Sequence, residues 1–259
     1  MIEFDAAAAR TAEAMYVTPD IVEQRREVRR RLGLSPGATV IDVGSGPGLL
    51  AAEMAAEIGP GGKVCGIDIS ADMIAMSAAR PLPPGSAPAE FVHGDVGQIP
   101  YPDGSFDAAV CTQVLEYVAD VPRALAEIRR VLRPGGRLAL LDTDWDSIVW
   151  HSSDPTRMER VLAAWAEHLV DPWLPRTLQA ALRRVGFAPE PPQVVPLLNV
   201  GHTDAMYSAR AIGLIAGYVP GHRGVTQAEA DAWAEDLRSM GDDYFFSLNR
   251  YLFVASRPN

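Results

Sequence analysis

Between residues 39 and 142 the sequence alternates short apolar, β-branched runs with longer amphipathic ones. Runs such as TVIDVG at 39–44 predict strands, and runs such as LLAAEMAAEI at 49–58 predict helices. Strands that are joined by single helices pair in parallel, through right-handed crossovers that place helices on both faces of the sheet. The pattern therefore predicts an α/β fold built on a parallel sheet.

The remaining elements follow from the same periodicities. Thr18, Pro19 and Asp20 are typical of a helix N-cap and first turn, and Gly33 of a helix end. Beyond residue 144 the alternation loosens. Strands are expected at 39–44, 63–69, 90–95, 106–112, 137–142, 193–200 and 245–258, and helices at 19–32, 49–58, 71–80, 121–132, 155–170, 175–187, 204–217 and 226–239.

The stretch GSGPG at 44–48 follows the first predicted strand and precedes a helix. In an open parallel sheet, ligands bind at the carboxyl ends of the strands, where a loop without side chains lets a ligand touch the main chain. Gly44, Gly46 and Gly48 fit that requirement. The nicotinamide motif GxGxxG needs a further glycine at position 49, where this chain has Leu49.

Asp68 ends the second predicted strand, 20 positions after Gly48. A carboxylate at this place can accept hydrogen bonds from both hydroxyl groups of a ribose. The alternative is an acid that only caps a loop. The combination of glycine loop and carboxylate favours a nucleoside ligand.

Charge and composition narrow the possible partners. The net charge of −10 argues against a general nucleic-acid binder, because phosphates would be repelled. No apolar stretch is long enough to span a membrane, and acids stand where a signal peptide would be basic, so we expect a cytoplasmic protein without membrane insertion. Cys65 and Cys111 each lie in a predicted strand and are expected to be buried thiols.

An arginine cluster, QRREVRRR at 24–31, is the exception to the acidic balance. Ile21, Val28 and Leu32 recur at helical spacing around it and would form a buried stripe. The arginines are then the solvated face of a helix, and a binding site for an anionic partner is the alternative.

Four motifs in this order resemble the class I S-adenosylmethionine-dependent methyltransferases, in the branch of the ubiquinone and menaquinone enzymes. The resemblance covers residues 15–145 strongly and the rest only in outline. It implies a Rossmann-like, doubly wound, seven-stranded, mostly parallel sheet with helices on both faces and a helical lid. The motifs are VIDVGSGPG, GIDIS followed by MI, GDVGQIPYPDGSFDAAVCTQVLEYV and RVLRPGGRLALLD.

The resemblance also implies three parts of one compact domain. Residues 1–35 would be a helical segment that covers the cofactor site, residues 36–145 the cofactor-binding core, and residues 146–259 a lid with substrate-binding insertions and the last strands. Monomer and homodimer both remain open.

The cofactor implied is S-adenosyl-L-methionine. The three glycines would line its methionine part, with Asp42 supporting their loop. The other residues implied are Asp68 for the ribose, Ile69 and Met73 for the adenine, Asp95 and Val96 for the adenine amine, and Cys111 and Gln113 beside the methyl group.

Two departures from the family pattern matter. Many relatives have a histidine where this chain has Tyr117, so a role of that histidine does not transfer. After the fifth predicted strand the chain reads DTDWD, with Asp142 and Asp144 on one side of an extended strand and Asp146 continuing the series. Three acids could bind a divalent cation, but the other ligands of metal-dependent relatives are not recognisable, and no metal is expected.

The general base stays unknown. Weak candidates are His151, which closely follows the substrate-side strand, Tyr117 and Asp144. His168, His202 and His222 are further histidines without a distinguishing signal. If the acceptor is already ionised, no base is needed.

Aromatic residues indicate the class of acceptor. Of 19 aromatic residues, 13 lie at or beyond Trp145, although core packing of the lid accounts for many of them. We therefore expect methyl transfer, by in-line displacement, to a hydrophobic or aromatic small molecule such as a quinone-like ring or a secondary metabolite. A cyclase or pericyclase that keeps the cofactor without methyl transfer, a protein that only binds the nucleoside, and a nicotinamide-dependent oxidoreductase are the alternatives.

Overall fold

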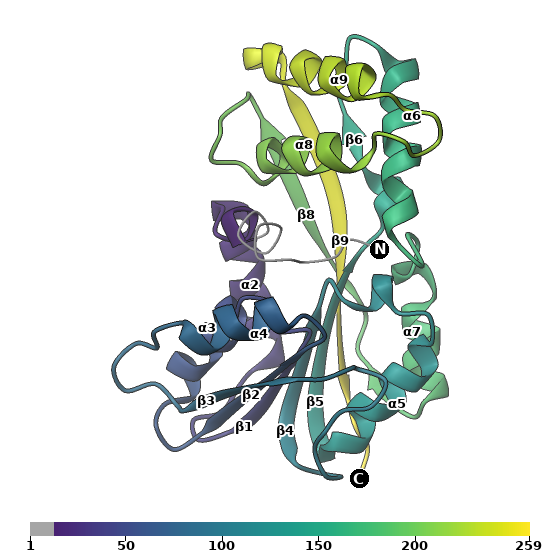
Figure 1. The fold of residues 1–259 in the computed structure, drawn as a ribbon. Coiled ribbons are helices and arrows are strands. Elements are labelled where there is room, and N and C mark those ends of the chain that lie inside the picture. Colours follow the sequence, from purple (N-terminus) through teal and green to yellow (C-terminus); the bar gives the residue numbers. More distant parts are fainter. Residues whose placement is uncertain (1–12) are drawn as a thin grey trace.

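The computed structural model describes residues 13–259 and has one mixed sheet at its centre (Figure 1). The order of the main path is β3-β2-β1-β4-β5-β9-β6, and β7 and β8 also pair with β9. The strands are β1 (Thr39–Val43), β2 (Lys63–Asp68), β3 (Ala89–His93), β4 (Phe106–Thr112), β5 (Leu132–Thr143), β6 (Val149–Trp150), β7 (Ala188–Pro189), β8 (Gln193–Val200) and β9 (Phe245–Ser256).

Within residues 13–259 the sheet has nine strands and not the expected seven, which corrects the sequence-based count. The first five strands pair in parallel, as predicted, and every pair that involves β9 is antiparallel. The two additional strands, β6 and β7, are two residues long and exist because β9 is long enough to pair with four others.

Helices cover both faces of the parallel part, as the alternation predicted. Val40 in β1 packs in one apolar core with α2 and α3, whereas the adjacent Ile41 packs in another with α5 and α7. The helices are α2 (Pro19–Leu32), α3 (Leu49–Ile58), α4 (Ala71–Ala79), α5 (Val121–Val131), α6 (Pro155–Trp165), α7 (Pro175–Arg184), α8 (Tyr207–Tyr218) and α9 (Gln227–Ser239), with short 3₁₀ turns η1 (Leu115–Tyr117), η2 (Trp145–Ser147), η3 (Ala166–His168) and η4 (Gly241–Asp243).

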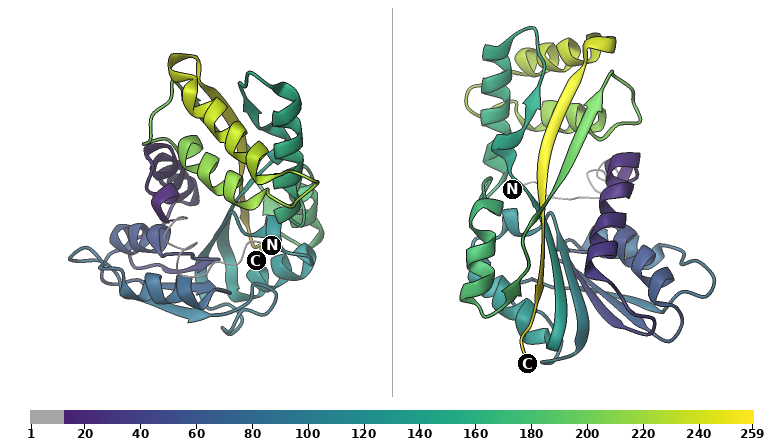
Figure 2. Two further views of the ribbon diagram at one scale, coloured as in Figure 1. Left: turned by 45° about the horizontal axis from the view of Figure 1, so that its top comes forward. Right: turned by 180° about the vertical axis from the view of Figure 1, so that it is seen from behind.

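A lid stands beyond the parallel strands and is built on the extended halves of β8 and β9. Residues 250–256 of β9 pair with β5 in the main sheet, while Phe246 and Ser247 pair with β6 in the lid. Figure 2 shows β9 running the whole length of the molecule, with α6, α8 and α9 around its first half. These helices have an apolar core of their own, centred on Trp233 and Tyr244, which are fully buried.

The arginine cluster lies on α2 and is neutralised by glutamates. Ile21, Val28 and Leu32 are buried, as their spacing predicted. Arg25 is buried as well and donates to Glu53 at 2.7 and 3.0 Å. Each of the other four cluster arginines also forms an ion pair with a glutamate.

Thr18 is the N-cap residue of α2, as predicted, although its side chain makes no capping hydrogen bond and its hydroxyl donates to the carbonyl of Met15 at 2.8 Å. One helix end needed correction. The helix expected at 155–170 ends as α6 at Trp165, because the imidazole of His168 bonds to the Trp165 carbonyl. The backbone N–H of Leu169 turns instead to Ala166, which gives the 3₁₀ turn η3.

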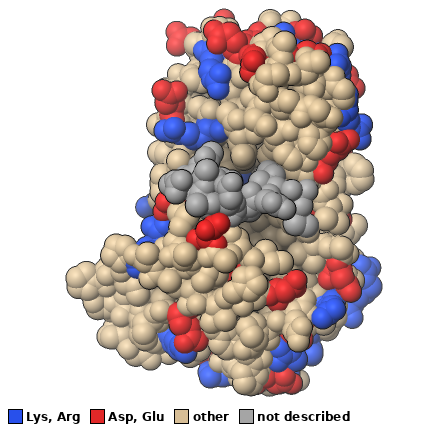
Figure 3. All heavy atoms as spheres, viewed as in Figure 1, with Lys and Arg blue, Asp and Glu red and all other residues tan. Residues whose placement is uncertain are grey.

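Acidic and basic side chains are interspersed on the face seen in Figure 3.

Within residues 13–259, no helix combines the length and apolarity that crossing a bilayer requires.

Candidate active site

The glycine loop leaves the carboxyl end of β1 with a left-handed backbone. Gly44, Gly46 and Gly48 have φ angles of 71°, 51° and 78°, which glycine adopts without strain. A Cβ on Gly44 would lie 2.2 Å from a methyl of Val114, and one on Gly48 would lie 2.7 Å from the Ser77 Cβ. A Cβ on Gly46 would meet nothing within 4 Å. Packing therefore requires a glycine at positions 44 and 48, whereas Gly46 faces open space.

Asp68 joins the loops that follow β1 and β2. Its Oδ2 accepts the N–H of Gly46 at 2.8 Å, and its Oδ1 accepts the N–H of Ser70 at 2.8 Å. A carboxylate oxygen has two lone pairs, so each of these oxygens can accept one more hydrogen bond. Asp68 thus fixes the glycine loop and can still bind a ligand.

Asp42 lies beneath the loop and is buried, with no hydrogen-bond partner for its Oδ2 among the described residues. Burial, together with the nearby charge of Asp68, raises the pKa of Asp42 to about 7. The site therefore holds a carboxyl group that is partly protonated at neutral pH.

The raised pKa of Asp42 predicts a pH-dependent stability. The folded protein keeps a proton that the unfolded chain loses near pH 4, so ionising Asp42 costs stability as the pH rises from 4 through 7. We expect Asp42→Asn to gain about 2 to 3 kcal/mol in free energy of unfolding, relative to wild type, between pH 5 and pH 8. Urea denaturation at both pH values measures this gain, with Asp72→Asn, in an exposed position, as the control. A difference that does not change with pH contradicts it.

The residues expected at the adenine lie at the same end of the sheet. Ile69 follows β2 and is 68% exposed, whereas Met73 on α4 is buried and packs against Tyr16. Asp95, in the loop after β3, is exposed, and its Oδ1 accepts a backbone N–H two residues on at 2.6 Å. Val96 packs against the main core.

Cys111 and Gln113 stand at the end of β4. Cys111 is buried, and so is Cys65, as predicted. Gln113 has a positive φ of 57°, and its Oε1 accepts the hydroxyl of Thr143 at 2.7 Å. This bond ties the end of β4 to the end of β5.

Glu116, an acid within the apolar stretch LEYV, is a site residue that was not predicted from the sequence. It is 1% exposed, and its Oε2 accepts the backbone N–H of Thr143 and the indole N–H of Trp145, both at 3.2 Å. Burial raises the pKa of Glu116 and of the neighbouring Asp142, and the charge of Arg250 opposes that shift. The only signal in the sequence is a charged residue where apolar ones surround it.

The three weak base candidates are not brought together. Tyr117 has its ring 5.8 Å from that of His168, and burial raises its pKa. Asp144 is held by Arg176 through two hydrogen bonds of 2.8 Å, and His151 is exposed beyond β6.

The three acids at the end of β5 and directly after it are divided between two environments. Arg176 also binds Asp146 at 2.9 Å, whereas Asp142 is buried. Within the described part of the chain, no group of three or more histidine, cysteine or acidic side chains is placed to hold a metal ion.

Three further histidines, His168, His202 and His222, lie in the lid. His168 is buried among aromatic rings, and His202 has its ring 5.2 Å from that of Tyr244. His222 stacks on Tyr218 at 4.3 Å and lies 3.1 Å from a carboxylate oxygen of Glu167.

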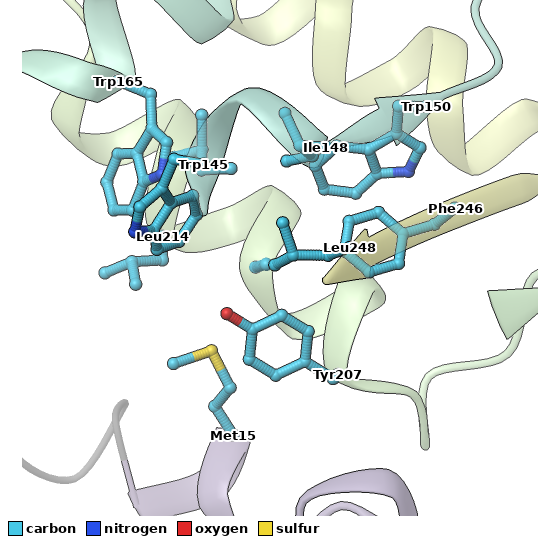
Figure 4. Close-up of a pocket in the computed structure, with 11 residues that line it drawn as sticks. Met15, Trp145, Ile148, Trp150, Trp165, Tyr207, Leu214, Phe246 and Leu248 are labelled. Carbon is cyan, nitrogen blue, oxygen red and sulfur yellow. The ribbon is translucent and has the colours of Figure 1, made fainter. Parts of the chain in front are cut away.

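A small apolar pocket lies between the lid and the segment before α2 (Figure 4). Figure 4 shows the indoles of Trp145 and Trp165 on one side, Trp150 and Phe246 on the other, and Tyr207 below. Its lining residues are Met15, Trp145, Ile148, Trp150, Trp165, Tyr207, Ala211, Leu214, Ile215, Phe246 and Leu248.

The pocket adjoins the carboxyl ends of the parallel strands. The 3₁₀ turn η2 begins at Trp145, two residues after the end of β5. Met15 lines the pocket, while the next residue, Tyr16, packs against Met73 in the region of Ile69. Glycine loop, carboxylates and aromatic pocket therefore gather at one end of the sheet.

Comparison with known proteins agrees with this arrangement. Residues 41–140 match the family described as "Methyltransferase domain". An uncharacterized protein of transposon TN4556 from Streptomyces fradiae is 34% identical over 238 residues, which are 86% of this chain and 64% of that protein.

Two named methyltransferases each match about half of the chain's length or less. Demethylmenaquinone methyltransferase from Listeria monocytogenes is 35% identical over 49% of this chain and 54% of its own. 2-Phytyl-1,4-naphtoquinone methyltransferase from Synechocystis is 38% identical over 42% of this chain and 47% of its own. The chain thus spans about half the length of these relatives.

Solved structures share the fold. Phosphoethanolamine N-methyltransferase 2 of Haemonchus contortus, in complex with S-adenosyl-L-methionine, has a TM-score of 0.63 at 18% identity, over 98% of this chain and 58% of that one. The [4+2]-cyclase SpnF has a TM-score of 0.58 at 25% identity, over 91% of this chain and 80% of that one. Residues 41–140 thus match a methyltransferase domain, and the fold of the chain is that of S-adenosylmethionine-dependent methyltransferases.

Proposed function

We propose that the protein transfers a methyl group from S-adenosylmethionine to a hydrophobic or aromatic small molecule. One observation carries this proposal: an aromatic pocket opens at the end of the sheet where the glycine loop and Asp68 lie. The division into a covering segment at 1–35, a cofactor core at 36–145 and a lid at 146–259 is part of the proposal, and residues 1–12 lie outside the described part of the chain.

The residues at the end of the sheet fit the cofactor. Gly46 leaves open space above the loop, and Asp68 keeps lone pairs for the ribose hydroxyls. The buried, unpartnered Oδ2 of Asp42 is an acceptor next to the loop that would support the cationic methionine part. Ile69 and Met73 would pack against the adenine, with Asp95 and Val96 at its amino group.

When bound, S-adenosylmethionine supplies a methyl group attached to a positively charged sulfur. A nucleophilic atom of the acceptor can attack this methyl group in line and displace the sulfur. The chain's own residues would position the two reactants and exclude water from them. Gln113, fixed by Thr143, and the buried Cys111 would border the methyl group. Holding two reactants in line can contribute effective molarities of roughly 10⁵ M, so a strong base is not required.

The apolar lining indicates the acceptor class. Pockets lined mainly by aromatic and aliphatic side chains bind ligands with large apolar surfaces. Two of the relatives are named as methyltransferases of demethylmenaquinone and of 2-phytyl-1,4-naphtoquinone, which supports a quinone-like ring as acceptor.

A matched pair of glycine variants tests the cofactor loop. Gly46→Ala places a methyl group in the open space above the loop at φ 51°, and Gly33→Ala introduces the same left-handed strain at φ 66°, at the end of α2, also without a clash. Each variant is expected to lose about 1 kcal/mol of stability. Only Gly46→Ala is expected to weaken S-adenosylhomocysteine binding, by about tenfold, in calorimetry. Equal affinities in both variants contradict the proposed site.

Incubation with a methyl-labelled cofactor tests the reaction. Wild-type protein, labelled S-adenosylmethionine and a panel of reduced naphthoquinones and phenols are expected to give a labelled organic product and S-adenosylhomocysteine. Binding of S-adenosylhomocysteine without label in any product, together with an isomerised acceptor, supports a cyclase of the kind that SpnF is named for. Absence of binding rejects the assignment altogether.

A further inference from the structure

His168 and Trp165 form a stacked pair inside the lid. Their ring centroids lie 3.7 Å apart with the planes inclined by 32°, and the residues are only 2% and 4% exposed. Three further rings surround His168, with centroids 5.6 to 5.8 Å from its own: Tyr117 from η1, Trp145 from η2 and Tyr218 from α8. The pair therefore sits in an aromatic box.

Two nitrogen atoms of this pair are buried without a hydrogen-bond partner among the described residues, His168 Nε2 and Trp165 Nε1. The Nδ1 of His168 bonds to the backbone oxygen of Trp165. A carbonyl only accepts, so Nδ1 carries the proton and Nε2 offers a lone pair. The indole nitrogen of Trp165 can only donate. One acceptor and one donor, both costly to leave unpaired, thus face the same box.

The state of the imidazole decides what it can do. Burial lowers the pKa of His168 to about 4, and the bond to the Trp165 carbonyl opposes this shift only in part. The ring is therefore neutral near pH 7. A general base works best with a pKa near the working pH, so His168 is suited to accept a hydrogen bond rather than to remove a proton.

The aromatic box lies next to the acceptor pocket. Trp145 and Trp165 line that pocket, and Figure 4 shows the indole nitrogen of Trp165 on the side of its ring that faces Trp145. Tyr117 follows the end of β4 and Trp145 follows the end of β5. The indole nitrogen of Trp165 therefore belongs to the pocket wall, and His168 lies next to it in the aromatic box.

A hydroxyl group is complementary to these two nitrogens, because it donates one hydrogen bond and accepts others. We propose that His168 and Trp165 determine specificity by binding the hydroxyl group of a hydroxylated aromatic acceptor. Calling that ligand the methyl acceptor rests on the proposed function. The hydrogen-bonding site itself rests on the geometry of the pair.

Two probes of matched shape test the proposal, 2-naphthol and 2-methylnaphthalene, which differ in a hydroxyl and a methyl group. Their dissociation constants are measured by equilibrium dialysis with wild type and His168→Phe, which keeps an aromatic ring but removes both nitrogens. The ratio of the two constants is expected to shift about threefold to tenfold against 2-naphthol in the variant, the size of one hydrogen bond. Binding of 2-methylnaphthalene is expected to stay within twofold.

Trp165→Phe is the second variant and removes the donor, so its ratio is expected to shift in the same direction. A ratio that is equal in wild type and in a folded variant overturns the proposal and leaves the two nitrogens to buried water.

A measurement on the wild-type protein does not depend on how the variants fold. In protein with ¹⁵N-labelled histidine, the unprotonated Nε2 resonance of His168 is expected to shift on addition of 2-naphthol and not on addition of 2-methylnaphthalene. No selective shift among the five histidines overturns the proposal.

Calorimetry with S-adenosylhomocysteine separates the two proposals. Loss of cofactor binding with an intact preference for 2-naphthol rejects the proposed function alone. Cofactor binding and methyl transfer without that preference reject the role of His168 and Trp165 alone.

Discussion

Asp68→Asn is expected to weaken binding of S-adenosylhomocysteine by about 100-fold, because an amide offers one acceptor oxygen where the carboxylate offers two. The N–H of Gly46 or that of Ser70 then loses its 2.8 Å partner. The ribose also loses the charge-assisted hydrogen bonds of the proposed site. Isothermal titration calorimetry of the variant and the wild type measures the difference in affinity.

Asp72→Asn is the matched control, since Asp72 lies on the first turn of α4, four residues further on, and is exposed. Its affinity for S-adenosylhomocysteine is expected to stay within about twofold of wild type. An Asp68→Asn protein that binds within threefold of wild type would show that Asp68 only fixes the loop.

Gly44→Ala is expected to lower the free energy of unfolding by about 2 to 4 kcal/mol. The left-handed φ of 71° contributes about 1 kcal/mol of strain, and the remainder comes from overpacking. The new methyl group would lie 2.2 Å from a methyl of Val114, which closes the site from the β4 side. Chemical denaturation monitored by tryptophan fluorescence measures the loss.

Two comparisons isolate the steric part of that effect. Gly46→Ala carries similar strain without a clash, so it is expected to lose about 1 kcal/mol only. In the double variant Gly44→Ala, Val114→Ala, the loss in free energy of unfolding is expected to be about 1 to 3 kcal/mol smaller than the sum of the two single losses. Additive effects contradict the close contact between Gly44 and Val114.

Local sequence signals were sufficient for most elements. The predicted strands at 106–112 and 193–200 and the helix at 49–58 have the boundaries found in the structure. These segments follow one periodicity throughout and end at turn-forming residues, so neighbours in the sequence decide their conformation.

Predictions failed where contacts distant in sequence intervene. The strand expected at 137–142 extends over Leu132–Thr143, because β4 pairs with it from Phe106 onward, across an irregularity in register. The end of α6 depends on a histidine side chain that bonds to the backbone, and no helix-ending residue marks it.

The cofactor end of the site could be predicted in outline, because its glycines and Asp68 lie in short motifs. The acceptor end of the site could not be predicted from the sequence. Its lining residues run from Met15 to Leu248, and their meeting depends on how the lid folds over the sheet. The aromatic residues after residue 144 indicated a lid but not which of them line the pocket.

β9 belongs to two apolar cores at once, with Phe253 in the main sheet and Phe246 in the lid. Because a continuous hydrogen-bonded strand is stiff, the lid cannot rotate relative to the main sheet unless the hydrogen bonds between β9 and β8 break. Exchange of a bulky ligand is then expected to need displacement of side chains that line the pocket, such as Met15, and not rotation of the lid. The lid and the main sheet are expected to move as one rigid body.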